Sequence, residues 1–300
     1  MSSPSPLDSV QLNFSSGDLL ALNLALALIM YGVALDLSWD DFKYLVKNPK
    51  GFFLGIFSQF LLLPFLTFLL VLLIKPPTSV ALGMFLVAAC PGGNVSNFLT
   101  SLAKGNTALS VSLTGFSTAF SVILTPLNFA LWAGLYGPTA GMMKEISLDV
   151  LDVVITVSLI LGIPLILGIL TRKHFPSKAD QASKILRPLS ILIFAAFVIL
   201  AFKANFDLFL THIGQIFLLV LAHNFIALAA GYLSSRFGKL PLPDQKTLTI
   251  ETGIQNSGLG LVLIFTYFEG LGGMAIITAW WGIWHLISGM ILASLWKFRS

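Results

Sequence analysis

The sequence predicts an all-α polytopic membrane protein, and its composition carries that prediction. Hydrophobic residues make up 56% of the 300 residues, charged residues make up only 10%, and the mean hydropathy is +0.91. An ordinary soluble domain contains about 45–50% apolar and about 25% charged residues. The apolar residues fall into long runs, and a helix needs about 20 of them to cross the hydrocarbon core. This composition excludes a single soluble domain and a disordered chain.

Nine apolar runs are predicted to form membrane-spanning helices. Turn-forming residues separate them, for example Lys-Pro-Pro at 75–77 and Gly-Leu-Gly-Gly at 270–273. The runs occupy residues 19–37, 51–74, 80–103, 108–135, 150–170, 189–203, 213–233, 248–268 and 274–296. Because the connections are short, the whole chain (1–300) is predicted to form one membrane domain.

Lysine and arginine predict the orientation of the chain, because cytoplasmic loops carry an excess of these residues. Nine helices place the two termini on opposite sides of the membrane. Three of the seventeen Lys and Arg then lie on the side of the N-terminus: Lys75, Lys144 and Lys203. We therefore expect a multi-pass protein of the cell membrane with its N-terminus outside and its C-terminus in the cytoplasm. Topology, rather than nucleic-acid binding, explains the net charge of +4.

Two of the predicted helices contain a polar interruption. Segment 90–97 reads Cys-Pro-Gly-Gly-Asn-Val-Ser-Asn, and segment 251–258 reads Glu-Thr-Gly-Ile-Gln-Asn-Ser-Gly. Irregular backbone survives in a bilayer only where protein or a wet cavity surrounds it. An intramembrane carboxylate such as Glu251 costs about 2.5–3.5 kcal/mol on insertion scales, so it indicates a functional site. The simpler interpretations are a proline kink in the first segment and a late helix start in the second.

The two interruptions lie five helices apart, so they cross the membrane in opposite directions. Matching interrupted segments in two halves of opposite orientation are typical of inverted-repeat secondary transporters. We therefore predict a five-helix repeat whose first copy lacks its first helix. In this arrangement the two discontinuous helices cross at the membrane midplane. The sequence contains no phosphate-binding loop, which argues against a pump driven by ATP.

The side chains gathered at such a crossing suit a monovalent cation. Asn, Ser, Thr and Gln offer neutral oxygens, Glu251 offers one negative charge, and hard cations prefer oxygen ligands. A half-helix that starts near Val95 directs its positive end towards the centre, which favours an anion. These features predict a sodium-coupled carrier of an organic anion. A channel or a proton-coupled carrier is the alternative, because Glu251 alone could carry a proton. An enzyme is not expected, because no second carboxylate or nucleophile motif accompanies Glu251.

Three segments resemble the bile acid:sodium symporter family: residues 90–97, 104–110 and 246–259. The resemblance implies a transporter that works by alternating access, with a core domain moving against a panel domain. The core is expected at residues 51–135 and 213–296, and the panel at residues 19–37 and 150–203. The resemblance also implies two bound sodium ions. The substrate it implies is an organic anion, either a bile-acid-like steroid or a smaller carboxylate or sulfonate.

The family resemblance further implies which residues form the sites. The first sodium site would use Ser96, Asn97, Ser110, Thr114 and Glu251. The second would use the side chains of Gln59, Glu251 and Gln255 with the backbone carbonyls of Thr252 and Ile254. The substrate would meet Asn94, Val95, Asn256 and His285.

Three further polar residues within the apolar runs have other interpretations. Cys90 precedes the first interruption, and a superfamily relative that exports arsenite uses a cysteine near this position. The amides and the carboxylate around Cys90 suit a hard cation better than a thiolate-bound one. His223 and Asn224, in the seventh run, could touch the site, but a packing pair between helices is the favoured interpretation.

Overall fold

The computed structural model describes residues 5–9, 16–36, 39–145, 151, 155, 158–204 and 206–299. Within these residues every named element is a helix, and an isolated β-bridge joins Gly92 to Gln255. The described part of the chain is therefore all-helical, as the composition predicts. The end of the predicted span 19–37 and the start of the predicted span 150–170 lie outside the described residues.

The first part of the chain leads from a short N-terminal helix into a long apolar one. The second predicted span is continuous, and a turn of π-helix (η1) lies in its middle. The amphipathic helix α3 precedes that span and is rich in polar residues on one face. The bounds are α1 (Pro6–Ser9), α2 (Ser16–Ala34), α3 (Trp39–Lys47), α4 (Pro49–Phe57), η1 (Ser58–Leu62) and α5 (Leu63–Ile74).

The third and eighth predicted spans are each built from two half-helices. The third consists of α6 (Thr78–Ala89) and α7 (Val95–Leu102), and the eighth of α14 (Leu242–Gly253) and α15 (Ser257–Tyr267). α14 begins before the predicted residue 248 because a proline occupies its first turn, where no backbone N–H is needed. Glu251 consequently lies near the end of a half-helix of 12 residues, not at a late helix start.

The remaining helices extend beyond the apolar runs that predict them. The Gly-Pro pair at 137–138, which follows the fourth apolar run, is the start of α9, since proline is tolerated in the first helical turn. The apolar pattern leaves 171–187 as a connection, but this basic segment is helical on both sides of Phe175. Its Ala and its polar Lys, Arg and Gln are all good helix formers. The bounds are α8 (Thr107–Leu135), α9 (Gly137–Glu145), η2 (Ser158–Gly162), α11 (Ile163–His174), α12 (Pro176–Ala204), α13 (Phe206–Phe237) and α16 (Gly272–Arg299).

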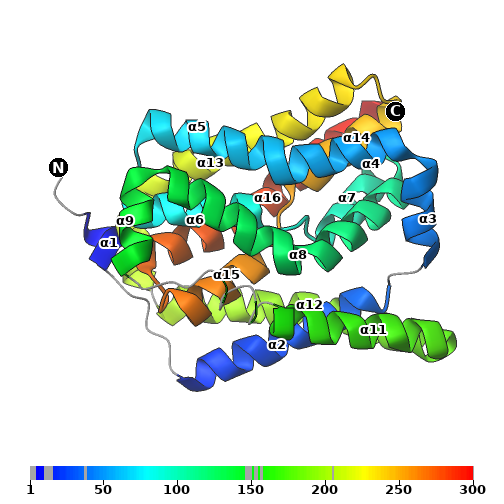
Figure 1. Cartoon of the computed structure of the whole chain (residues 1–300), viewed down its shortest axis with the longest axis horizontal. Helices are drawn as coiled ribbons and strands as arrows, with labels where there is room; N and C mark the ends of the chain where they lie inside the picture. Colours follow the sequence, from blue (N-terminus) through cyan, green and yellow to red (C-terminus); the bar gives the residue numbers. More distant parts are fainter. Residues whose placement is uncertain are drawn as a thin grey trace.

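The helices form two groups, which Figure 1 shows as separate layers. α2, α11 and α12 lie along the lower edge of that view and pack against one another. In the larger group, α6 packs against α8 and α16, and α13 packs against α14 and α5. α15 contacts α2, and α8 contacts η2, so these elements join the two groups. α1 and the end of α16 lie at opposite ends of the molecule (Figure 1).

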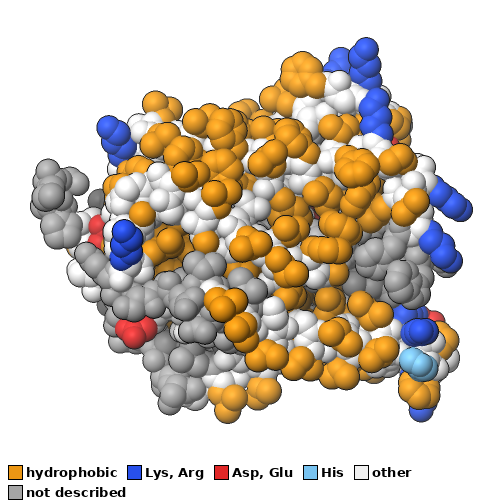
Figure 2. All heavy atoms as spheres, viewed as in Figure 1, with side chains coloured by type: hydrophobic (Ala, Val, Ile, Leu, Met, Phe, Trp, Pro, Cys, Tyr) orange, Lys and Arg blue, Asp and Glu red, His pale blue; other side chains and the backbone are white. Residues whose placement is uncertain are grey.

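The outer surface is suited to a lipid environment. Four helical stretches in the described residues are long and apolar enough to cross a membrane: Pro49–Ile74, Thr107–Leu135, Ile216–Phe237 and Gly272–Phe298. The two half-helices Thr78–Ala89 and Ser257–Tyr267 are shorter apolar segments. Figure 2 shows hydrophobic side chains across the middle of one face, with Lys and Arg gathered at its ends. The fold is thus consistent with a polytopic membrane protein.

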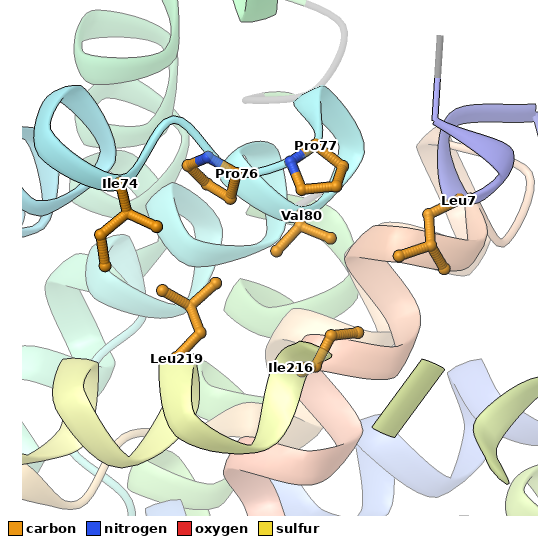
Figure 3. A pocket seen from close by; sticks show the side chains of 7 residues that line it. All are labelled: Leu7, Ile74, Pro76, Pro77, Val80, Ile216 and Leu219. Carbon is orange, nitrogen blue, oxygen red and sulfur yellow. The ribbon is translucent and has the colours of Figure 1, made fainter. Parts of the chain in front are cut away.

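The short helix α1 is fixed to the start of α6. The Asp8 carboxylate accepts a hydrogen bond from the backbone N–H of Ser79 at 2.7 Å, and the Ser79 hydroxyl donates to the Leu7 carbonyl at 3.1 Å. An acid at a helix N-terminus is stabilising. Leu7 also faces a cavity of about 140 Å³ between α1, α6 and α13 (Figure 3). The side chains that line this cavity are all apolar, so it offers no group that would orient a charged ligand.

Candidate functional site

The two interruptions meet through their backbones. The N–H of Gly93 donates to the carbonyl of Ile254 at 2.8 Å, and the N–H of Asn256 donates to the carbonyl of Pro91 at 2.9 Å. These two bonds pair the segments like short antiparallel strands around the bridge from Gly92 to Gln255. Peptide groups released from a helix need partners when no water is present. We call this paired segment, residues 90–94 with 254–256, the crossing.

Glycine is required at the crossing because the Glu251 carboxylate lies against the backbone. A Cβ atom at Gly92 would lie 2.6 Å from Oε1 of Glu251, which is closer than real Cβ contacts. At the end of α14, a Cβ atom at Gly253 would lie 2.2 Å from Cδ2 of Leu228 on α13. The glycines therefore allow close approach of neighbouring groups, rather than only interrupting the helices.

Three hydroxyl groups surround the Glu251 carboxylate. Ser96 and Ser110 donate to Oε2 at 2.6 and 3.0 Å, and Thr114 donates to Oε1 at 2.5 Å. The exposed fractions of Ser96, Ser110 and Thr114 are 2% or less, and that of Glu251 is 5%. Hydrogen bonds to a charged acceptor are the stronger kind, and they offset part of the cost of burying a carboxylate.

Asn97 completes the same cluster. Its Oδ1 lies 2.9 Å from the Ser110 hydroxyl and 3.2 Å from the Thr114 hydroxyl, so each hydroxyl shares its one proton between Asn97 and Glu251. The structure therefore brings together all five residues predicted for the first sodium site, from α7, α8 and α14. Each hydroxyl oxygen keeps lone pairs, so these side chains and the carboxylate form an oxygen-rich set of ligands suited to a hard cation. Within the described residues, no group of three or more His, Cys, Asp or Glu side chains could hold a metal ion.

Gln59, Thr252 and Gln255, predicted for the second sodium site, form a second cluster, whereas the Glu251 carboxylate predicted there makes its hydrogen bonds to the first cluster. Nε2 of Gln59 donates to Oε1 of Gln255 at 2.7 Å and to the carbonyl of Cys90 at 2.9 Å. Nε2 of Gln255 in turn donates to the carbonyl of Thr252 at 2.7 Å. Oε1 of Gln59 is buried and has no hydrogen-bond partner among the described residues. A buried acceptor of this kind needs a partner, and a cation would supply one.

A π-helical turn positions Gln59, and the sequence alone did not predict it. Pro64 has no backbone N–H, so it cannot bond the carbonyl of Phe60 four residues before it. The side chain of Asn128 on α8 bonds that carbonyl instead, with Nδ2 at 2.8 Å from the oxygen. The helix widens at this point into η1. π-Helical turns are frequently found at functional sites.

The predicted substrate residues divide into two kinds. The Asn94 side chain is exposed, and those of Val95 and Asn256 are partly exposed. Asn256 also caps α15, because its Oδ1 accepts the backbone N–H of Leu259 at 3.0 Å. His285 differs from the other three, since its exposed fraction is only 4%. The structure therefore groups Asn94, Val95 and Asn256 at the accessible side of the crossing and places His285 in the protein interior.

His223 and Asn224, the predicted packing pair, make contacts with different helices. Nε2 of His223 lies 2.7 Å from the Thr67 hydroxyl on α5, and its ring packs against Trp281. Nδ2 of Asn224 donates to the carbonyl of Gly253 at 2.8 Å. Asn224 therefore touches the end of α14 directly. The sequence favoured packing over contact with the site for this residue, because residues 224 and 253 lie in different helices and share no motif.

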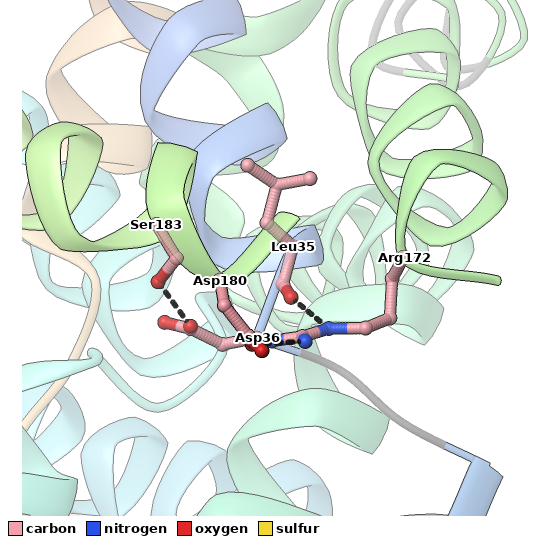
Figure 4. A network of polar contacts seen from close by, with 5 residues as sticks. All are labelled: Leu35, Asp36, Arg172, Asp180 and Ser183. Atoms are coloured by element: carbon pink, nitrogen blue, oxygen red, sulfur yellow. Dashed lines mark hydrogen bonds and ion pairs between the residues drawn. The ribbon is translucent and has the colours of Figure 1, made fainter. Parts of the chain in front are cut away.

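A separate polar cluster lies between the ends of α2, α11 and α12 (Figure 4). Arg172 donates to the Leu35 carbonyl through Nε and pairs with Asp180 through Nη1, both at 2.5 Å. The Ser183 hydroxyl donates to Asp36. These residues line a cavity of about 550 Å³. Because Lys184 also lines this cavity, two acids face two bases, so the cluster joins the three helices and shows no preference for an ion of either sign.

Comparison with known proteins agrees with the family resemblance of the sequence motifs. The family model described as the Sodium Bile acid symporter family matches residues 23–212. The uncharacterized sodium-dependent transporter YocS of Bacillus subtilis is 34% identical over 276 residues, covering 92% of this chain and 83% of the relative. The probable sodium/metabolite cotransporter BASS1 of Arabidopsis thaliana chloroplasts is 31% identical over 274 residues, covering 91% of this chain and 66% of the relative. The human P3 protein is 26% identical over 264 residues, covering 87% of this chain and 54% of the relative.

Proposed function

This protein belongs to the sodium bile acid symporter family, a family of transporters and not of enzymes, and on that premise we propose that it is a sodium-coupled symporter of an organic anion. The names of the bacterial and chloroplast relatives support sodium dependence and a metabolite as substrate. The observation that carries the proposal is the buried Glu251 carboxylate, with three hydroxyls around it and a second amide cluster beside it.

The two clusters are proposed to bind one sodium ion each. An ion in the first cluster would rest between the Glu251 carboxylate, the three hydroxyls and Asn97, and would neutralise the buried charge. An ion in the second would share the Glu251 carboxylate and take Oε1 of Gln59, the Gln255 side chain and the carbonyls of Thr252 and Ile254. Because α7, α8, α14 and η1 all contribute ligands, bound sodium would hold these elements together and fix the crossing.

The organic anion is proposed to bind at the accessible side of the crossing. Asn94 and Val95 lie at the start of α7, where backbone N–H groups and the helix dipole favour negative charge. The partly exposed Asn256 lies opposite them at the start of α15. A carboxylate or a sulfonate could meet this face while sodium is bound on the buried side. The buried His285 would then influence the substrate site from the protein interior, without direct contact with the substrate.

Transport is proposed to proceed by alternating access. The moving units would be the group of α2, α11 and α12, as the panel, and the larger group that contains the crossing, as the core. We assign nine spans and an inverted repeat to the chain, and we place the crossing at the membrane midplane. Two features support this arrangement: both interrupted helices are present, and α1 and the end of α16 lie at opposite ends of the molecule (Figure 1). An arsenite exporter is less well supported, because Cys90 is buried and offers its carbonyl, not its thiol, to Gln59.

The proposal is tested by screening organic anions against the purified protein in matched NaCl and KCl solutions. A ligand that binds only the folded state raises the melting temperature by mass action. We expect a carboxylate, sulfonate or bile salt to stabilise the protein in NaCl and much less in KCl. The same anion should accumulate in proteoliposomes under an inward sodium gradient. Stabilisation that is equal in both salts, or uptake driven only by a pH gradient, would contradict sodium coupling.

A further inference from the structure

Asn224 is a buried residue on α13 that bonds the interrupted end of α14. Its exposed fraction is 1%. Nδ2 donates to the carbonyl of Gly253 at 2.8 Å, and Oδ1 accepts a hydrogen bond from the Ser288 hydroxyl on α16 at 2.6 Å. The side chain therefore uses both its donor and its acceptor, and it links three helices at one point.

The carbonyl of Gly253 needs a partner from outside its own helix. The last carbonyls of a helix have no N–H group four residues ahead of them. The chain leaves α14 at Ile254, whose backbone is extended, with φ of −113° and ψ of 97°. Asn224 supplies the missing donor. An asparagine side chain has a fixed planar geometry, so it also sets the direction in which this carbonyl points.

α13 and α14 pack too closely to slide past one another. A Cβ atom at Gly231 on α13 would lie 2.3 Å from the Leu248 carbonyl, and one at Gly253 would lie 2.2 Å from Leu228. Backbone therefore lies against backbone at Gly231, and backbone lies against the Leu228 side chain at Gly253. With Asn224 at the end of α14, the helix pair forms a rigid support behind the crossing.

The bonded carbonyl belongs to the segment that forms the second cluster. Gly253 lies between Thr252 and Ile254, whose carbonyls accept Nε2 of Gln255 and the N–H of Gly93. A rotation of the peptide group at Gly253 would change ψ of Gly253 and φ of Ile254, and so the direction of this carbonyl relative to those on either side. Three carbonyls in succession are thus held by Gln255, Asn224 and Gly93.

We infer that Asn224, held in turn by Ser288, is a positioning residue for sodium binding at the second cluster. This inference rests on the proposed function. Asn224 itself does not reach the ion; it fixes the carbonyls of Thr252 and Ile254 in the directions that an ion would require. A site whose ligands are pre-oriented binds more tightly, because less freedom is lost when the ion enters.

The test compares Asn224→Leu with Ser288→Ala and with the control His223→Leu. Leucine matches asparagine in size but leaves the Gly253 carbonyl without its donor. His223 is the neighbouring buried residue on the same helix, and it bonds Thr67 on α5 rather than the crossing. The measurements are the melting temperature in KCl and the sodium concentration that gives half of the full thermal stabilisation.

Asn224→Leu is expected to raise that sodium concentration by at least about tenfold, since a buried acceptor is left unsatisfied. Ser288→Ala should raise it less, by about two- to fivefold, because only the support of Asn224 is lost. His223→Leu should lower the melting temperature in KCl but leave the half-saturating sodium concentration within about twofold of the wild type.

Equal sodium dependence of Asn224→Leu and the wild type would overturn the inference. So would an equal sodium shift in His223→Leu, because the effect would then be one of general destabilisation. If Asn224→Leu does not fold, Ser288→Ala decides between the two outcomes. A wild-type protein that shows no sodium response at all would instead overturn the proposed function, and the inference with it.

Discussion

At the residue scale, the first cluster is built around the buried Glu251 carboxylate. Ser96, Ser110 and Thr114 all donate to it, although they come from α7 and α8. The resemblance of the motifs to a known family implied that these residues meet, whereas the residues alone left interhelical packing as an equal alternative for Ser110 and Thr114. It did not predict the contacts of Asn224 or Asn128, since each bonds a backbone carbonyl that is exposed only by the local distortion of another helix.

Glu251→Gln should abolish sodium-driven uptake and sodium-dependent thermal stabilisation together. Glutamine keeps the size of the side chain but removes the only formal charge in both clusters. The melting temperature in KCl should not fall, because the cost of burying a charge disappears. The measurements are uptake into proteoliposomes under a sodium gradient and the melting temperature with increasing NaCl. Sodium-driven transport at the wild-type rate by this variant would contradict the role of Glu251.

Asn256 and Gln255 are adjacent, yet their substitution should have different consequences. Asn256→Ser keeps an oxygen that can cap α15, so it should alter the choice of substrate while the response to sodium alone is retained. Gln255→Ala should weaken the sodium response first, by about tenfold or more, because it removes a buried amide from the second cluster. The check is a sodium titration of the melting temperature without substrate. An equal loss of the sodium response in both variants would refute the separation of ion and substrate across the crossing.

At the element scale, the crossing depends on two interrupted helices whose backbones bond each other directly. The positions of the breaks are predictable, because Pro91, Gly92 and Gly93 cannot continue an apolar helix. The starts of α9 and α12 are not predictable from hydropathy, since these helical segments are polar and lie outside the apolar runs. The π-helical turn η1 depends on Asn128 from another helix, which no local pattern reveals.

Gly92→Ala should disrupt the crossing more than the loss of a glycine normally would. The added Cβ atom would lie 2.6 Å from Oε1 of Glu251, so the carboxylate or the backbone must move. We expect the half-saturating sodium concentration to rise by about tenfold or more, as for other strained substitutions in packed interiors. Gly134→Ala on α8 is the control, because a Cβ atom there meets nothing within 4 Å. Similar sodium titrations for the two variants would show that the close approach at Gly92 is unimportant.

At the scale of the whole molecule, the charges and the apolar surface agree with one another. Figure 2 shows Lys and Arg at the ends of a face whose middle is covered by hydrophobic side chains. The sequence predicted this pattern because charged side chains are excluded from the hydrocarbon core. It also predicted an all-helical chain, since helices keep every backbone bond within one segment. How the helices pack was not predictable in detail, because close contacts such as Gly231 with Leu248 depend on pairs of distant residues.

The orientation of the chain is tested by cysteine labelling in intact cells. Cys90 is the single native cysteine and is buried, so the wild-type protein serves as the unlabelled control. A cysteine at Ser3 should react with a membrane-impermeant reagent, because the charge distribution places the N-terminus outside. A cysteine at Ser177, which is exposed on α12, should react only after the membrane is opened. The reverse pattern would contradict the orientation.

The central claim is that two sodium ions bind at the crossing and share Glu251. The most direct measurement is the number of radioactive sodium ions bound per purified molecule at saturation. The account predicts two ions for the wild type, one for Thr114→Val, which loses a ligand of the first cluster only, and none for Glu251→Gln. Two ions bound by Glu251→Gln, or the same number for all three proteins, would contradict the claim.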